Sequence, residues 1–318
     1  MKRSVFFKTS AAIAATSLLP AVSMSGGLSS GSSTVSTTGK KPLTFAHLSD
    51  IHVKPGTIPE AGMAKAFNHV QKNFPKVEFI MNGGDAIMDA LEANKQQTQI
   101  QFDLFKTILQ KENSLPIYHC IGNHDVWGWF IKENKPEQDR LYGKTWVVEE
   151  LQMKNRYYSF SKGRWHFIVL DSTQLNPAGG YVGKLDDDQL NWLQQELKQV
   201  PADKFVCIVS HIPLLSICAG LFFDKTETNG DLKIQRNLMH TDFLALKKLF
   251  RQYPNIKVCI SGHIHLQDEL DYLGVQYYCN GAISGNWWKG AFQEFAPAYA
   301  VMELYDDGTS KRTMITYE

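Results

Sequence analysis

The sequence predicts an α/β fold, a layered αββα sandwich in which two mixed β-sheets are flanked by helices. Two observations predict it. Beyond the N-terminal region, hydrophobic runs typical of buried strands alternate with segments of helical spacing, the pattern of parallel strands joined by right-handed crossovers. From about Tyr157 onward, short strand-like runs follow one another with tight turns such as Lys162-Gly163-Arg164, as expected for antiparallel pairs. A second sheet packed on the first accounts for both patterns.

Five hydrophobic runs have the length and composition of buried strands, and polar residues follow each run directly. These expected strands comprise residues 43–48, 77–81, 117–121, 205–209 and 258–260. In open α/β sheets, ligands bind outside the carboxyl ends of the strands. We therefore expect the five strand ends to converge on one edge of a sheet and to form a site there.

Four segments with helical spacing connect the strands, at residues 61–72, 97–111, 186–198 and 241–252. Pro59 and Pro75 mark the expected limits of the first. Closely spaced runs predict antiparallel strands at residues 157–161, 165–170, 269–273, 275–279 and 299–304. The connections 126–156 and 212–237 are long, and we expect them to form a rim over the site.

The N-terminus has the composition of a signal peptide. Basic residues precede an apolar run over residues 11–19, and Pro20 and the small residues Ala21-Val22-Ser23 follow. We expect residues 1–23 to be a signal peptide, 24–41 a Ser/Gly/Thr-rich linker and 42–318 a single domain, exported to the periplasm or secreted. An ordinary first helix is the alternative, but the linker would leave such a helix nothing to pack against.

Composition limits the classes to which the chain can belong. Of its 318 residues, 43% are hydrophobic and 12% aromatic, ample for a large core. A formal charge of +1 gives no electrostatic reason to expect binding to nucleic acid. No run after the N-terminal one reaches about 18 apolar residues, so we expect no membrane span. The five cysteines lack paired spacing, and we expect all of them to lie outside the site. We expect the four in apolar runs to be buried thiols, at positions 120, 207, 259 and 279.

Five short motifs at the expected strand ends carry side chains that bind metals. They are Asp50-Ile51-His52, Gly84-Asp85, Gly122-Asn123-His124-Asp125, Ser210-His211 and Gly262-His263-Ile264-His265. Asp50 and His52 are two residues apart in a segment expected to be extended, so that both side chains point to the same side and one ion can take both. His263 and His265 repeat this arrangement.

The set of donors indicates the kind of metal. Two carboxylates, one carboxamide and four imidazoles, without a thiolate, suit manganese, iron or zinc and contain too much nitrogen for calcium or magnesium. Seven ligands exceed the positions around one ion, so we expect two divalent or trivalent ions (Mn, Fe or Zn) that share a bridging carboxylate. Such a centre keeps a local positive charge, which attracts a phosphate anion.

The ordered set of motifs resembles that of the calcineurin-like metallophosphoesterases over residues 43–305. The resemblance implies one such domain, with a dinuclear metal site at the carboxyl ends of the strands. It implies that Asp50, His52 and His265 hold the first ion. By the same resemblance Asn123, His211 and His263 hold the second ion, and Asp85 bridges the two.

The resemblance also implies an activity, the hydrolysis of a phosphate ester by in-line attack of a metal-bound hydroxide. His124 would bind neither ion and would assist the departing oxygen with a proton or a hydrogen bond. Asp125 or Asp89 would orient it. The alternatives are a structural histidine at position 124 and a turn or helix cap at Asp125.

Two departures separate the chain from well-known branches of the family. Purple acid phosphatases carry a tyrosine ligand three residues after the bridging aspartate, where this chain has Met88. Serine/threonine protein phosphatases follow that aspartate with an Asp-Arg-Gly pattern and follow Asn-His with Glu, where this chain has Asp125. The chain therefore resembles the cyclic-nucleotide phosphodiesterase-like and general phosphodiesterase branch.

Aromatic residues close to two motifs bear on the substrate. Trp127 follows the Gly-Asn-His-Asp motif, and Trp287 and Trp288 follow the strand expected at residues 275–279. They either stack on a base or sugar of the substrate, at about 1 to 3 kcal/mol per stacked base, or pack under a long loop. Stacking suits a small nucleotide-like or sugar-phosphate substrate, a phosphodiester or a phosphomonoester.

Two other functions compete with a phosphoesterase. A non-catalytic metal- or phosphate-binding protein of the same fold would keep the motifs without turnover. A nuclease of the same superfamily is disfavoured because the chain has no basic stripe. The sequence leaves the oligomeric state open.

Overall fold

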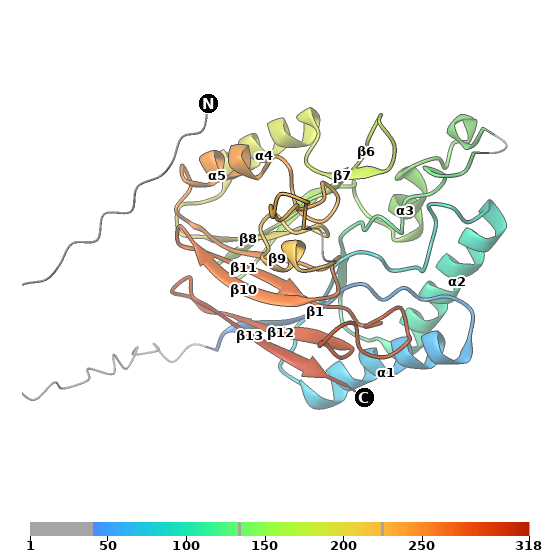
Figure 1. Cartoon of the computed structure of the whole chain (residues 1–318). Coiled ribbons are helices and arrows are strands. Elements are labelled where there is room, and N and C mark those ends of the chain that lie inside the picture. Colours follow the sequence, from blue (N-terminus) through green and yellow to red (C-terminus); the bar gives the residue numbers. More distant parts are fainter. Residues whose placement is uncertain (1–40, 133–134, 224–225, 318) are drawn as a thin grey trace, which may run out of the picture. The chain divides into compact units, whose positions relative to one another are not determined.

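Two β-sheets organise residues 41–132, 135–223 and 226–317, the part of the chain that the computed structural model describes (Figure 1). The expected signal peptide and the expected linker, except Lys41, lie outside the described residues. In chain order the strands are β1 (Leu43–Leu48), β2 (Ile80–Asn82), β3 (Ile117–His119), β4 (Tyr158–Lys162), β5 (Trp165–Val169), β6 (Thr173–Leu175), β7 (Tyr181–Gly183), β8 (Phe205–Val209), β9 (Ile256–Ser261), β10 (Gln267–Tyr272), β11 (Val275–Asn280), β12 (Ala298–Leu304) and β13 (Ser310–Thr316).

Both large sheets are mixed. The first has the order β13-β12-β1-β2-β3, with β1, β2 and β3 parallel and the last two strands of the chain antiparallel to their neighbours. The second has the order β10-β11-β9-β8-β5-β4, in which the four inner strands are parallel and both edge strands are antiparallel. Strands β6 and β7 form a separate hairpin.

Local sequence explains where the helices begin. The α-helices are α1 (Thr57–Asn73), α2 (Lys95–Glu112), α3 (Thr145–Glu150), α4 (Asp187–Gln199) and α5 (Phe243–Phe250), with 3₁₀ turns η1 (Pro136–Gln138) and η2 (Cys218–Gly220). Asn94 caps α2 by accepting from the Gln97 amide, and Asp186 caps α4 by accepting from the Gln189 amide, both at 2.9 Å.

Three apolar clusters make the layers of the sandwich. Between the sheets, the buried Phe167 ring of β5 lies 5.5 Å from Phe45 of β1, edge to face. Buried residues of α1 and α2 cover the outer face of the first sheet, and those of α4 and α5 cover the outer face of the second. Helices therefore flank both sheets, as Figure 1 shows, and the predicted αββα sandwich is confirmed.

The division of strands between the sheets differs from the expectation. The five motif-bearing strands do not share one sheet: β1, β2 and β3 belong to the first, and β8 and β9 belong to the second. The strand expected at residues 299–304 is β12, which joins the first sheet beside β1. The reason is that a hydrophobic run specifies a buried strand but not its partner, which the crossovers decide.

Several elements begin or occur where the sequence did not predict them. α1 begins at Thr57, so Pro59 lies in its first turn, where a missing backbone N–H costs no helical hydrogen bond. The long connection after Val126 contains α3, which was not predicted. Strand β13 was also missed, because its polar residues Ser310 to Thr313 do not form a hydrophobic run, although β13 pairs with β12 along its length.

The composition also led to expectations about membrane spans and about the cysteines. Within it, no helix combines the length and apolar character that a membrane span needs. All five cysteines are buried and unpaired, at positions 120, 207, 218, 259 and 279. Burial was expected for all of them except Cys218. Burial raises the pKa of the Cys207 thiol, which therefore stays protonated at neutral pH.

Candidate metal centre

The motif residues leave their strands in an unusual backbone conformation. Five of the expected ligands have positive φ angles: Asp50 at 56°, His52 at 49°, Asp85 at 52°, His263 at 73° and His265 at 56°. The segment after β1 was expected to be extended, but it turns back at Asp50 and His52. Such left-handed conformations cost about 1 to 3 kcal/mol each and persist where the surroundings impose them.

Glycines allow the motif segments to approach one another. A Cβ atom at Gly262 would lie 2.2 Å from Asp50 Oδ2, and one at Gly122 would lie 2.1 Å from Asp85 Oδ1. The absence of a side chain at these two positions lets the backbone of one motif contact the carboxylate of another. The glycines of the Gly-Asn-His-Asp and Gly-His-x-His motifs are thus part of the packing of the site.

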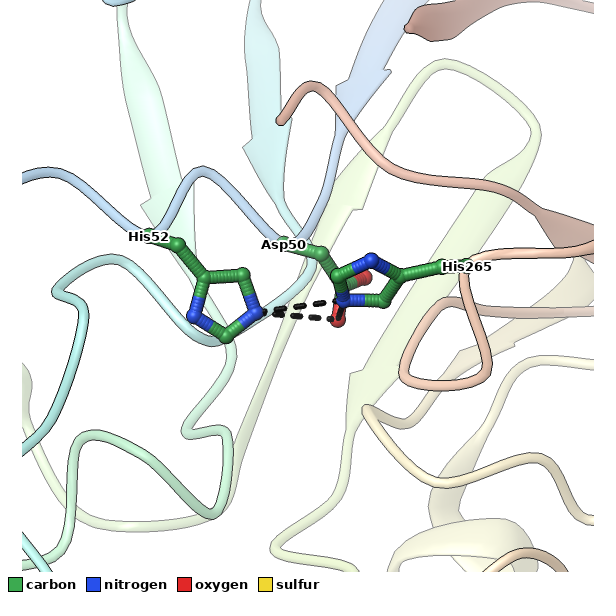
Figure 2. A group of neighbouring side chains, drawn as sticks. All are labelled: Asp50, His52 and His265. Atoms are coloured by element: carbon green, nitrogen blue, oxygen red, sulfur yellow. Dashed lines mark hydrogen bonds and ion pairs between the residues drawn. The ribbon is translucent and has the colours of Figure 1, made fainter. Parts of the chain in front are cut away.

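Asp50, His52 and His265 form a first group of facing donor atoms, shown in Figure 2. The Nε2 atoms of the two rings are 3.2 Å apart, and Asp50 Oδ1 lies 3.4 Å from His265 Nε2 and 4.0 Å from His52 Nε2. The other Asp50 oxygen, Oδ2, accepts from the Ser49 hydroxyl at 2.5 Å and from the His263 amide at 2.9 Å. Oδ1 is thereby held toward the two rings.

A second group comes from both sheets. His211 Nε2 lies 3.1 Å from Asn123 Oδ1 and 3.2 Å from His263 Nδ1. Asp85 belongs to both groups, because its Oδ2 is 3.2 Å from His211 Nε2 and 3.6 Å from His52 Nε2. Its Oδ1 accepts from the His124 amide at 2.7 Å. The structure thus brings all seven expected ligands together, with Asp85 between the two groups.

Backbone carbonyls orient three of the four rings. His211 Nδ1 lies 2.9 Å from the Gly83 carbonyl, His263 Nε2 lies 2.8 Å from the Asn237 carbonyl, and His265 Nδ1 bonds the Gly285 carbonyl. A carbonyl accepts only, so each of these nitrogens carries a proton, and in a neutral ring the other nitrogen presents its lone pair to the group. Sequence reasoning missed these three partners, because a backbone carbonyl has no sequence signature.

The electrostatics of the site favour cations. Asp50 and Asp85 are 0% and 1% exposed, and no lysine or arginine of the described residues forms an ion pair with either. Burial alone would raise the pKa of Asp50, but hydrogen bonding to His265 and the charge of His211 hold it well below its usual range. Burial lowers the pKa of His52, which leaves the His52 ring neutral with a free lone pair.

The pKa of His211 shifts in the opposite direction to the pKa values of His52 and His263. Its burial lowers the pKa, but the Asp85 carboxylate outweighs burial and raises it to about 9. Burial and repulsion from His211 lower the pKa of His263 to about 3. A single imidazolium therefore balances two buried carboxylates only in part, which leaves a negative site that a cation neutralises.

The donor set fits metal ions. Zinc to nitrogen bonds of about 2.0–2.1 Å place the ligand atoms of a tetrahedral ion roughly 3.3 Å apart. The facing nitrogens and oxygens of the two groups lie 3.1 to 4.0 Å apart, close to this spacing. That the seven residues hold two ions remains a prediction.

His124 lies beside the first group. Its ring centroid is 4.8 Å from that of His52, edge to face, and its side chain is partly buried. Its Nδ1 is buried and has no hydrogen-bond partner within the described residues. The position next to the donors agrees with the expectation for this residue, and its acid role remains a prediction.

Neither carboxylate that was expected to orient His124 bonds its Nδ1. Asp125 is fully buried and accepts from the amides of Ala86 and Gly122, at 2.8 and 2.9 Å. Asp125 thereby links the loops after β2 and β3. This structural role corresponds to the turn that the sequence offered as the alternative for this residue. Asp89 accepts from the Glu92 amide at 3.3 Å. The prediction that Asp125 or Asp89 orients His124 is therefore wrong, because each carboxylate bonds the backbone instead.

The three tryptophans occupy different places. Trp127 is 5% exposed, packs 5.3 Å from Trp146 and donates to the Ala93 carbonyl, so its assignment to the substrate is corrected to the core. Trp288 lies against Gly62 of α1 and donates to the His52 carbonyl at 3.0 Å, which makes it a support of the metal-binding loop. Trp287 alone is at the site, with its ring 4.4 Å from that of His265.

Sequence reasoning missed Tyr181 of β7, which lies on the other side of the centre. Its ring is 6.1 Å from that of His263 and 6.4 Å from that of Phe130, on which it stacks. Burial raises the pKa of the Tyr181 phenol, so the phenol stays protonated and can donate a hydrogen bond. No motif surrounds this tyrosine, and only the fold brings it to the site.

Strand ends from both sheets bring carboxylates and imidazoles together around one shared carboxylate. This arrangement is typical of a metal-dependent hydrolase. The family model of the calcineurin-like phosphoesterases matches residues 43–267, and the chain belongs to that family. It is therefore a metallophosphoesterase, as the motifs predicted.

Individual relatives agree with this membership. A 3',5'-cyclic-nucleotide phosphodiesterase of Nostoc sp. (strain PCC 7120) is 26% identical over 85% of this chain and 91% of the relative. The 3',5'-cyclic adenosine monophosphate phosphodiesterase CpdA of Escherichia coli (strain K12) is 26% identical over 46% of this chain and 48% of its own. A dimetal phosphatase from Danio rerio shares the fold, with a TM-score of 0.60 and 16% identity over 88% of this chain and 100% of its own.

Removing metal from the purified protein should lower its melting temperature. The two buried carboxylates would then lose the charge that compensates them. Ions at 100 times their Kd stabilise a folded protein by about 2.7 kcal/mol, which corresponds to a rise of roughly 5 °C in Tm. Dialysis against dipicolinate, followed by metal counting and calorimetry, measures the difference.

An equal Tm with and without metal would contradict the assignment of these residues as metal ligands. The variant Asp85→Asn lacks the shared charge, so its Tm should differ less between the two states than that of the parent protein.

Proposed function

We propose that this protein is an exported, dinuclear metal-dependent phosphoesterase that hydrolyses a small phosphodiester with a nucleotide-like group. The observation that carries the proposal is the position of Asp85 Oδ2, within 3.6 Å of donor atoms from both groups. One carboxylate oxygen between two sets of donor atoms is the arrangement that a pair of ions requires.

In this proposal Asp50, His52 and His265 hold one ion, Asn123, His211 and His263 hold the other, and Asp85 contacts both. When bound, the ions activate water for attack on phosphorus and neutralise charge on the phosphoryl oxygens. The carbonyls of Gly83, Asn237 and Gly285 keep the lone pairs of three rings directed inward. The protein thus supplies a rigid set of ligands that needs no rearrangement.

The proton for the departing oxygen comes from His124 in this proposal. Its ring stands edge to face with His52, and its Nδ1 forms no hydrogen bond to the described residues. The ring thus lies directly beside the proposed ligands of the first ion. Tyr181, whose phenol keeps its proton, faces the centre from the His263 side and donates a hydrogen bond to a phosphoryl oxygen.

Two observations support a nucleotide-like substrate. The relatives named above are 3',5'-cyclic-nucleotide phosphodiesterases. The partly buried Trp287 ring lies 4.4 Å from that of His265 and 5.6 Å from that of Phe292, so an aromatic surface adjoins a proposed metal ligand. A base stacked there gains about 1 to 3 kcal/mol. Phosphomonoesters and sugar phosphates are the other candidates.

A substrate panel tests the proposal on protein whose metal content has been counted. We expect 3',5'-cyclic nucleotides and bis-p-nitrophenyl phosphate to be hydrolysed faster than phosphomonoesters, with turnover that is lost on chelation and restored by manganese, iron or zinc. Absence of turnover with all three metals would favour the non-catalytic binding protein. Preference for a polynucleotide would favour the nuclease.

A pair of tryptophan variants separates stacking from general damage. Trp287→Ala should raise KM for the cyclic nucleotide about 10-fold and leave p-nitrophenyl phosphate unaffected, because only the nucleotide has a base to stack. Trp192→Ala, on α4 and packed on Tyr157, is the matched control and should change neither KM.

Replacing His124 tests its acid role. His124→Ala should lower kcat by about 100-fold or more for an ester with a poor leaving group, and much less for p-nitrophenyl esters, whose leaving group needs no proton. Steady-state kinetics on both esters measures the ratio, with metal content and Tm as controls for folding. Equal losses on the two esters would assign His124 a structural role.

Export rests on the N-terminal composition of residues 1–23. We expect the mature protein in an exported fraction to begin near Met24, which N-terminal sequencing of that fraction determines. Recovery of the exported protein with an intact Met1 would remove this part of the proposal without affecting the catalytic part.

A further inference from the structure

The long connection that follows β8 exposes a group of large hydrophobic side chains. Eleven such side chains are exposed among the described residues, and five of them lie within residues 217–234. The five are 42% to 68% exposed and comprise Ile217, Leu221, Phe223, Leu232 and Ile234, here called the rim patch. Single exposed hydrophobic residues are ordinary, but a group of them on one surface marks a binding site.

The members of the rim patch lie together around the 3₁₀ turn η2. A Cβ atom at Gly220 of η2 would lie 3.2 Å from Leu232 Cδ2 and 3.9 Å from Ile234 Cγ1. Ile217 and Leu221 flank the same turn on either side. The missing side chain at position 220 therefore lets the two halves of the connection meet, and their hydrophobic side chains form one surface.

A row of ring contacts joins the rim patch to the metal centre. The ring centroid of Phe223 lies 4.5 Å from that of Phe222, which lies 5.5 Å from that of Phe292. The Phe292 ring in turn lies 5.9 Å from that of His265. Three successive contacts therefore connect an exposed ring of the rim patch to a proposed metal ligand.

The same connection is fixed to the centre at a second point. Beyond the rim patch, the Asn237 carbonyl bonds His263 Nε2 at 2.8 Å. On the side of the ring contacts, the Gln293 side chain donates to the Phe222 carbonyl at 2.7 Å. The rim patch thus belongs to a segment that is held beside proposed ligands of both ions.

The charges around the rim patch cancel. Between residues 217 and 236 the described charged side chains are two acidic and two basic ones, Glu227, Asp231, Lys233 and Arg236. Glu227 and Lys233 pair at 3.3 Å, and Asp231 accepts from the Asn229 side chain at 2.7 Å. Because the surface has no net charge, it favours a ligand group whose burial removes hydrocarbon from water.

We propose that the rim patch binds a long alkyl or acyl chain of the substrate, which makes the substrate an amphipathic phosphodiester. The inference rests on the proposed function, because the phosphate holds the substrate at the metal centre while its chain extends past Phe222 to the rim patch. A diester has two organic groups, and the second is the nucleotide-like group beside Trp287. The rim patch therefore contributes to substrate specificity and takes no part in the chemical step.

A series of alkyl 4-nitrophenyl phosphates tests the proposal on full-length protein whose metals have been counted. In each ester water attacks phosphorus, the bond to 4-nitrophenolate breaks and the alkyl phosphate remains, so only the chain differs. Full burial of one CH₂ group gives a gain of about 4-fold, and an open surface gives about 2-fold. We therefore expect kcat/KM to rise about 10-fold from the butyl to the octyl ester, below the concentration at which micelles form.

Surface variants locate the chain. The double variant Leu221→Ser/Phe223→Ser should lose most of the gain from butyl to octyl, because it removes two exposed hydrophobic contacts. Leu244→Ser/Leu273→Ser replaces two comparably exposed leucines, on α5 and in the turn between β10 and β11. This matched control should keep the gain. The ratio of octyl to butyl within each protein is independent of differences in metal content.

Alkylphosphonates give the same comparison without turnover, because their carbon–phosphorus bond is not hydrolysed. Isothermal titration of the metal-loaded parent protein should show octylphosphonate binding about 10-fold more tightly than butylphosphonate. The double variant at positions 221 and 223 should bind the two alike, and the matched control should bind them as the parent protein does.

Three outcomes would overturn the proposal. They are equal kcat/KM for the butyl and octyl esters, a gain that the double variant keeps, and a gain that appears only once micelles form, which would indicate docking on a lipid aggregate. If none of the esters is hydrolysed with any of the three metals, the proposed function fails. The phosphonate titrations then still decide whether the rim patch binds a chain.

Discussion

Two carboxylates, Asp50 and Asp85, are buried where the two sheets meet, without an ion pair to any lysine or arginine of the described residues. The rest of the site depends on this constraint. Buried charge is tolerated only with hydrogen bonds and opposite charge close by. The amides of His263 and His124 supply hydrogen bonds, and the surrounding imidazoles supply only part of the opposite charge. In the proposed function, metal cations would complete the balance.

The same constraint explains the backbone of the motifs. Five ligand residues turn in left-handed conformations directly after their strands, and two glycines allow another motif to approach within contact distance of a carboxylate. Each such turn is unfavourable by itself. The apolar layers on both sides of both sheets supply the stability that holds these turns in place. The sandwich therefore acts as a rigid support for a site that is locally strained.

The surroundings of the centre divide into supporting and available groups. Asp125 and Trp288 support the loops, the first through backbone amides and the second through the His52 carbonyl. His124, Tyr181 and Trp287 adjoin the donors from different sides. This division follows from burial and hydrogen bonding, since residues that satisfy the backbone are not free to contact a substrate.

The sequence by itself determined the class of fold, the family and the seven side chains that the structure brings together, because strand ends, glycines and metal-binding side chains leave local patterns that recur in order. It also located β1 and β8 correctly, as uninterrupted hydrophobic runs. It did not determine that β8 and β9 join a different sheet from β1, because pairing is a long-range property. Only the tertiary structure decided that Trp127 is core, that Asp125 bonds backbone amides and that Tyr181 lies beside His263. It also decided that the carbonyls of Gly83, Asn237 and Gly285 bond the outer nitrogens of three rings. The physical reason is that these roles come from neighbours distant in the chain, and a side chain or a carbonyl acquires them only when the two sheets are packed together.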